Sequence, residues 1–294
     1  MSDTLESLRR KITGAKDLES VVRTMKVLAA STIGQYERAL RSLDDYYRTI
    51  EIGLTAYFYG NEKNMRALKE NSAPEKITAV VFGSDQGLVG QFNESLTEFA
   101  LKKLNFHKCP KKIWAVGDRV YSRLQDAGAA PSDILSVPDS VNSITAFVSD
   151  VLIEFEADYK TDENIGLYIF HNKPSYGAIY DQIETRLLPL DGDWLNKLCL
   201  KKWPTKYIPE VMNNRAGTLL ALIREYLFVS IFRAAAESLA SENASRLAAM
   251  QRAEKNIGEL LEELNRSFNR LRQNSIDEEL FDVISGFEAI TGRR

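Results

Sequence analysis

The chain has 294 residues, of which 38 are Lys or Arg and 41 are Asp or Glu, so its formal net charge is −3. A balance this close to neutral argues against a general nucleic-acid-binding protein, which is normally basic. The two cysteines, Cys109 and Cys199, and the two histidines, His107 and His171, match no disulfide framework or zinc-ligand spacing, so we expect neither a metal site nor a bound cofactor.

The sequence shows no pattern of a membrane span or a targeting segment. The most apolar run, Tyr226–Phe232, is seven residues long, whereas crossing a bilayer takes about 20. The N-terminal sequence MSDTLESLRRKI contains acidic residues and no apolar block, which is typical of neither a signal peptide nor a transit peptide. We therefore expect no direct insertion into a membrane.

The N-terminal region predicts one long helix, from Asp3 to about Phe58. No proline precedes Pro74 to break it, and Asp3 and Glu6 have the spacing of a capping box. After a one-residue slip near Leu18, apolar side chains recur with steps of three and four, the period of a coiled-coil seam. The seam positions are Leu8, Ile12, Ala15, Val22, Met25, Ala29, Thr32, Tyr36, Ala39, Leu43, Tyr46, Ile50, Gly53 and Tyr57.

The C-terminal region predicts a second, longer helix, from Asn213 to about Ile290. At 1.5 Å per residue it would be about 115 Å long, against about 80 Å for the N-terminal helix. If the two pair antiparallel, the end of the longer helix has no partner in its own chain. That end, Asn274–Ile290, keeps an apolar face, so we expect it to lie inside another protein.

The middle of the chain predicts an α/β domain, because short β-branched runs alternate with helical segments. The predicted strands are Ile77–Gly83, Ile113–Val116, Ile165–Asn172 and Ile183–Leu188, with one more short strand in Trp194–Pro209. The predicted helices are Asn93–Leu104, Arg119–Ala127 and Ser143–Tyr159. The predicted fold class is α+β overall: a long antiparallel coiled coil of the two terminal helices plus a central, Rossmann-like α/β domain. The predicted boundaries are 1–60, 75–210 and 211–294.

The loop GSDQGLVGQFN, residues 83–93, joins a predicted strand to a predicted helix, where a glycine-containing turn can hold phosphate. It matches neither the P-loop nor G-x-G-x-x-G. We interpret it as a tight turn in which Gly87 and Gly90 permit positive φ. No catalytic residue is predicted, because the polar residues at strand ends lack a matching nucleophile and favour capping or surface roles: Asp85, Asp118, Asp139 and His171.

Both ends of the chain resemble the gamma subunit of F-type ATP synthases. The stretch LRRKITGAKDLESVVRTMKVLAAS is similar to the opening helix of that family, with Thr24-Met25-Lys26 and Ala29-Ala30 in the expected places. The stretch Ser238–Leu280 is a closer match, through SLASE, ASRLAAM and the Arg272-Gln273 pair. In the middle, SDQGLVGQFN resembles the glycine turn of the family. The similarity covers nearly the whole chain in the same order.

The resemblance implies a central-stalk rotor subunit that transmits torque between a membrane ring of c subunits and a hexamer of alternating alpha and beta subunits, with the epsilon subunit as a further partner. It implies a non-catalytic chain, because the catalytic sites belong to the beta subunits. It also implies a peripheral location on the cytoplasmic face of a bacterial plasma membrane, or the equivalent face in an organelle. The hexamer contacts that it implies are Met25, Lys26, Arg246, Arg272, Gln273 and Glu279, and the bearing tip is Ile276, Leu280, Val283 and Ile284.

Two other functions are compatible with the same elements. The chain could be a coiled-coil tether that self-associates through its seam, without any part in a motor. It could also be a nucleotide-binding α/β protein with helical arms, although the phosphate-binding motif of such proteins is missing.

Overall fold

The computed structural model describes residues 4–58, 74–161, 164–175, 179–200, 203, 205–207 and 215–291. Helix α1, Leu5–Phe58, has 54 residues, and helix α7, Arg215–Thr291, has 77. Both predicted terminal helices are therefore confirmed. The predicted capping residue Asp3 and the predicted start at Asn213 lie outside the described residues. Thr4 caps α1, since its Oγ1 accepts a hydrogen bond from the backbone N–H of Ser7 at 3.2 Å.

The chain forms two compact units. The first, here called the helical unit, combines Met1–Ala29 with Leu247–Arg294, and the second, the sheet unit, is Ala30–Arg246. Helices α1 and α7 each run without a break from one unit into the other. Within the described residues, no helix combines the length and the apolar character that crossing a membrane requires.

The sheet unit contains a five-stranded sheet in the order β3-β2-β1-β4-β5. Three of its pairings are parallel, and only β4 and β5 are antiparallel. In the centre, Val80 lies in register with Trp114 on one side and with Ile169 on the other. The strands are β1 Lys76–Phe82, β2 Lys111–Val116, β3 Asp133–Leu135, β4 Ile165–Pro174 and β5 Tyr180–Leu188.

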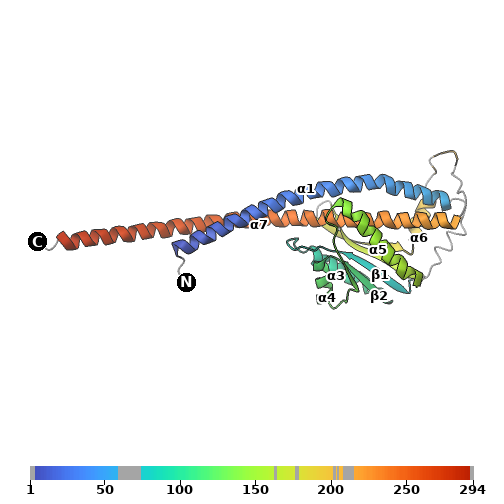
Figure 1. The fold of residues 1–294 in the computed structure, drawn as a ribbon, viewed down its shortest axis with the longest axis horizontal. Coiled ribbons are helices and arrows are strands. Elements are labelled where there is room, and N and C mark those ends of the chain that lie inside the picture. Colours follow the sequence, from blue (N-terminus) through green and yellow to red (C-terminus); the bar gives the residue numbers. More distant parts are fainter. Residues whose placement is uncertain are drawn as a thin grey trace. The chain divides into compact units, whose positions relative to one another are not determined.

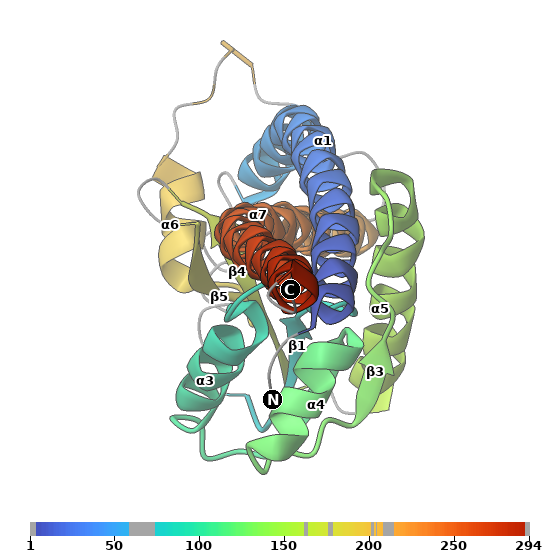
Figure 2. The same cartoon turned by 90° about the vertical axis from the view of Figure 1, so that its left-hand side faces the viewer.

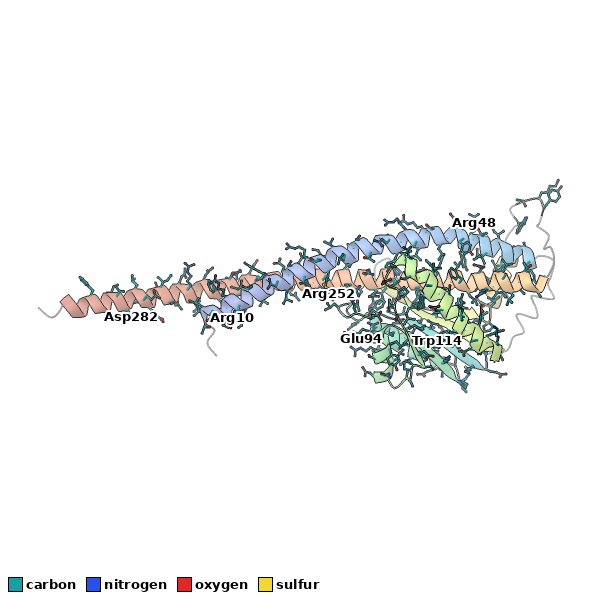
Figure 3. All side chains as sticks on the ribbon, in the orientation of Figure 1. Arg10, Arg48, Glu94, Trp114, Arg252 and Asp282 are labelled. Atoms are coloured by element: carbon teal, nitrogen blue, oxygen red, sulfur yellow. The ribbon has the colours of Figure 1, made fainter. Side chains whose placement is uncertain are left out.

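Helices cover both faces of this sheet, so the predicted mostly parallel α/β arrangement is confirmed (Figures 1 and 2). Alternate residues along β1 point to opposite faces: Val81 packs with α3 and α4, whereas Val80 packs with α5 and with the sheet-unit parts of α1 and α7. Trp114, labelled in Figure 3, is fully buried on that second face. The connecting helices are α3 Phe92–Leu104, α4 Asp118–Asp126, α5 Val141–Thr161 and α6 Gly192–Leu200.

Two predictions about secondary structure differ from the fold. The short strand predicted within Trp194–Pro209 is absent from the described part of that range: its first residues lie in helix α6, Gly192–Leu200, which buries Leu195 and Leu198 against the core, and residues 201–202, 204 and 208–209 lie outside the described residues. Strand β3 was not predicted, since it has only three residues and is stabilised by its parallel pairing with β2 rather than by a pattern of its own.

The seam of α1 also changes within the sheet unit. Tyr46, a predicted seam residue, is 43% exposed, whereas Tyr47 packs against Tyr226 with ring centroids 6.3 Å apart. Leu54, which was not predicted, is fully buried. Here α1 joins a core that also includes α5 and the sheet, so a wider stripe of the helix is covered than a two-helix seam would cover.

Candidate functional site

The last part of α7 presents an exposed apolar face. Every residue from Ile276 to Phe287 is exposed, including Leu280 at 57% and Val283 at 71%. Within the helical unit, α7 continues beyond the N-terminal end of α1 (Figure 1). We call this part of α7 the tip. It contains the four predicted bearing residues on one face of the helix: Ile276, Leu280, Val283 and Ile284.

Before the tip, α1 and α7 bury a seam between them. Leu8, Ile12, Ala15 and Ala29 of α1 are buried in the helical unit, as is Met250 of α7. Apolar residues of α7 further along are only partly buried, and burial ends after Ser275. The seam predicted from the apolar spacing is therefore present in this unit, and it stops where the tip begins.

Two of the predicted hexamer contacts lie at this seam: Met25 is one of its positions, and Lys26 is next to it. Met25 is half-buried. Lys26 donates to Glu254 Oε2 at 2.5 Å, and Arg23 Nε lies 3.5 Å from Glu254 Oε1. The hydrogen bond from Lys26, together with the charges of Lys26 and Arg23, lowers the pKa of Glu254. Lys26 thus already pairs within its own chain.

The remaining predicted contacts fall into two environments. Arg272, Gln273 and Glu279 are exposed on α7, on and just before the tip. Arg246 instead belongs to the sheet unit, where its side chain is only 13% exposed and donates to Glu242 Oε1 at 2.5 Å. Burial raises the pKa of Glu242, and Arg246 acts against that rise. Arg246 therefore belongs to a different unit from the tip residues.

In the sheet unit, α7 lies at the position where open α/β sheets usually bind ligands. That place is the crevice at the carboxyl ends of the strands where the strand order reverses, here between β1 and β4. Ser238 Oγ donates to the carbonyl of Phe82, the last residue of β1, at 3.3 Å, and Ser241 Oγ donates to the carbonyl of Asn172 in β4 at 3.0 Å. Helix α7 thus occupies the crevice with its own side chains.

The loop after β1 is joined to the same helix. Ser245 Oγ of α7 donates to the carbonyl of Val89 at 2.5 Å. Within the loop, the backbone N–H of Ser84 donates to Asn93 Oδ1 at 3.0 Å, and Asn93 Nδ2 donates to Ser84 Oγ at 2.9 Å. The interpretation as a tight turn is supported by Gly90, whose φ is 61°, but the second left-handed residue is Leu88, with φ 64°, and not Gly87.

The polar residues at strand ends have structural partners. Asp85 accepts hydrogen bonds from the backbone N–H groups of Asp118 and Val137, and Asp139 accepts one from the hydroxyl of Ser143 at 2.8 Å. These contacts agree with the capping roles predicted for the aspartates. No group of three or more His, Cys, Asp or Glu side chains within the described ranges is placed to hold a metal ion.

His171 is not a capping or surface residue, as its place at a strand end suggested. It is buried, and its Nε2 donates to Glu237 Oε2 of α7 at 2.9 Å, while Lys173 Nζ lies 3.5 Å from Glu237 Oε1. Sequence reasoning missed this pair because its members are 66 residues apart. The signal available was Glu237 itself, a charged residue within an otherwise apolar and small-residue stretch of α7.

The stability of the sheet unit is expected to decrease as the pH falls below 4.5, because Glu237 becomes protonated. Burial raises the pKa of Glu237, but the hydrogen bond from His171 and the charges around it outweigh burial, so the pKa lies below its ordinary value of 4.5. A lowered folded-state pKa stabilises the fold above the unfolded-state pKa, and this contribution is lost as the pH falls through the folded-state pKa. Urea unfolding at a series of pH values measures the loss.

Two variants separate this effect from other acid effects. Glu237→Gln should flatten the difference in unfolding free energy between neutral and acidic pH. Glu259→Gln, at a carboxylate that is 68% exposed, should leave that difference as in the unchanged chain. An acid dependence that is the same in both variants would show that Glu237 has no part in it.

The sequence is similar to that of known proteins over nearly the whole chain. A family model described as ATP synthase matches residues 4–290. The ATP synthase gamma chain of Sulfurihydrogenibium sp. (strain YO3AOP1) is 27% identical over 295 residues, covering 96% of this chain and 97% of the relative. The ATP synthase gamma chain of Ehrlichia ruminantium (strain Welgevonden) is 27% identical over 291 residues, covering 97% and 98%.

Solved structures show the same fold. The rotor of the Euglena gracilis mitochondrial ATP synthase in rotational state 1 matches with a TM-score of 0.65 at 16% identity, covering 92% of this chain and 98% of that chain. The central stalk and c-ring structure of the Tetrahymena thermophila mitochondrial ATP synthase matches with a TM-score of 0.54 at 20% identity, covering 79% and 99%.

Proposed function

The chain belongs to the ATP synthase family, and on that premise we propose that it is the gamma subunit, the central-stalk rotor that transmits torque between a membrane c-ring and an alpha/beta hexamer. In this role it couples ion flow to ATP synthesis or hydrolysis. It is a non-catalytic subunit, since catalysis belongs to the beta subunits.

The observation that carries this proposal is the exposed apolar tip after a buried seam. Side chains such as Leu280 and Phe281 are more than half exposed, and several of them share one helix face. Apolar surface of this extent on one face is typical of a site that another protein covers. A hexamer that encloses the tip would supply that cover, with Ile276, Leu280, Val283 and Ile284 as the bearing residues.

A rotor must also favour a different conformational state in each of the three equivalent subunits that it contacts. A contact shifts a conformational equilibrium only if its free energy differs between the two states, so the rotor surface has to be asymmetric. The tip provides such asymmetry, because its apolar side chains lie on one face and acidic residues such as Glu278 and Asp282 lie between them in sequence. We assign Arg272, Gln273 and Glu279 as polar hexamer contacts, because they are exposed beside this face.

We also propose Met25, Lys26 and Arg246 as hexamer contacts. Lys26 and Arg246 already hold carboxylates of their own chain, so a hexamer contact at either residue requires it to share or exchange its partner. Met25 is unbranched and half-buried, which suits a sliding contact. For the sheet unit we propose contacts with the epsilon subunit and the c-ring, at the cytoplasmic face of a bacterial plasma membrane or the equivalent face in an organelle.

Native mass spectrometry of the complex purified from membranes tests this function. One copy of this chain should accompany each alpha/beta hexamer, because a single shaft has to contact all the catalytic subunits in turn. Mild dissociation should release the chain together with the epsilon subunit. Recovery of the chain as a dimer without alpha and beta subunits would instead support the coiled-coil tether.

A further inference from the structure

The sheet unit contains a cavity of about 450 Å³. Its walls come from the end of α5, the start of β4, the end of β5 and the first turns of α7. The lining is mainly apolar: Phe155, Ile165, Leu190 and Leu227 contribute buried side chains, and Ile223 is partly buried. The volume falls within the range of about 300–1,000 Å³ that is usual for small-molecule sites.

The described residues at the mouth of the cavity are polar and include two basic side chains and one acidic one. Lys160, Arg224 and Glu156 belong to the lining and are exposed or partly exposed. Arg224 Nε lies 3.0 Å from Glu156 Oε1, and the Arg224 side chain is 57% exposed. The contact with Glu156 uses Nε, so the two Nη groups of the guanidinium can still donate to an anion at the mouth.

The combination of an apolar interior with a basic mouth selects an amphiphile whose head is an anion. A carboxylate suits this mouth better than a phosphate, because the described charged residues of the lining, Lys160, Arg224 and Glu156, sum to +1, which a singly charged head neutralises and a doubly charged head exceeds. The volume lies in the lower part of the usual range, which favours one acyl chain over two. A cationic head would meet both Lys160 and Arg224 and is disfavoured.

We propose that this cavity binds a single-chain fatty carboxylate, with its acyl chain between α5 and α7 and its carboxylate at Arg224 and Lys160. This site is separate from the tip and from the crevice that α7 fills, and it does not depend on the rotor function. Binding at this position would pack α7 more firmly against α5.

Isothermal titration of the full-length chain with dodecanoate, below its micellar concentration, tests the proposal. We expect saturable binding of one dodecanoate per chain. Arg224→Gln should weaken it about tenfold or more, since a charge-assisted hydrogen bond is lost. Lys160→Gln, at an exposed position, should weaken it by a smaller factor. Ile223→Trp should abolish it by filling the cavity, and thermal melting would verify that each variant is folded.

The control variant is Arg123→Gln. Arg123 is 50% exposed and pairs with Glu94 between α3 and α4, so it matches Arg224 in exposure and in having a carboxylate partner on another helix (Figure 3 labels Glu94). The affinity of the Arg123→Gln variant for dodecanoate should equal that of the unchanged chain. Dodecyltrimethylammonium should not bind. Equal binding of the cation, equal loss in both Arg variants, or no saturable binding would overturn the assignment. Binding that disappears in the intact ATP synthase would mean that a partner's side chain fills the cavity instead.

Discussion

Replacing Leu280 and Ile284 together by Asp is expected to uncouple the motor while leaving the chain itself folded. Both side chains are exposed, at 57% and 45%, so neither stabilises the isolated chain. In the assembled complex each would lose about 1.5–3 kcal/mol of apolar burial, and each new carboxylate would have to be desolvated. The tip contact should therefore weaken at least about a hundredfold. Ion pumping per ATP hydrolysed, measured in membrane vesicles, should fall towards zero.

The matched control changes two tip residues on another face of the helix. Glu278→Gln with Asp282→Asn alters two exposed side chains and removes two charges without touching the apolar face (Figure 3 labels Asp282). Pumping in this variant should stay close to that of the unchanged complex. If the Leu280→Asp/Ile284→Asp complex pumps normally, the apolar face of the tip is not a bearing.

Arg246→Ala is expected to destabilise the sheet unit by about 3–5 kcal/mol, because it leaves the Glu242 carboxylate buried without its partner. Glu242 is only 8% exposed, and burial already raises its pKa. Without Arg246 the pKa should rise further, so the loss should grow as the pH increases above the unfolded-state pKa. Chemical unfolding of the isolated chain measures the effect.

The chain offers a near-identical exposed pair as the control. Arg266 and Glu262 have the same spacing on the same helix, but their side chains are 81% and 73% exposed. Arg266→Ala should change the unfolding free energy by no more than about 0.5 kcal/mol. Glu242→Gln should restore much of the stability of Arg246→Ala, because it removes the unpaired charge. If Arg246→Ala leaves stability unchanged but impairs coupling, Arg246 acts on the hexamer rather than within its chain.

The features with a regular period could be predicted from the sequence. The absence of proline and the three-four spacing predicted α1 and α7 almost to their observed ends, and β-branched runs predicted four of the five strands. The exposed tip followed from the same reasoning, since the two helices differ in length. These predictions succeeded because burial of a periodic apolar face depends mainly on local sequence.

Features that depend on contacts between distant residues could not be predicted in this way. The pair of His171 and Glu237 exists because α7 crosses the carboxyl ends of β1 and β4, which no local pattern specifies. The hexamer contact at Arg246 stays a prediction, and within its own chain Arg246 pairs with Glu242, one turn away on the same helix. Whether such a pair is buried or exposed is decided by what packs over the helix, as the contrast between Arg246 and Arg266 shows.

Observation of single complexes tests the central claim most directly. The alpha/beta hexamer would be fixed to a surface, and a bead would be attached to the sheet unit through Lys108→Cys, an exposed position, after replacement of Cys109 and Cys199 by Ser. When ATP is added, we expect the bead to turn in one direction in discrete steps, because the chain rotates inside the hexamer. Beads that stay at a fixed angle while the same complexes hydrolyse ATP would contradict the rotor function.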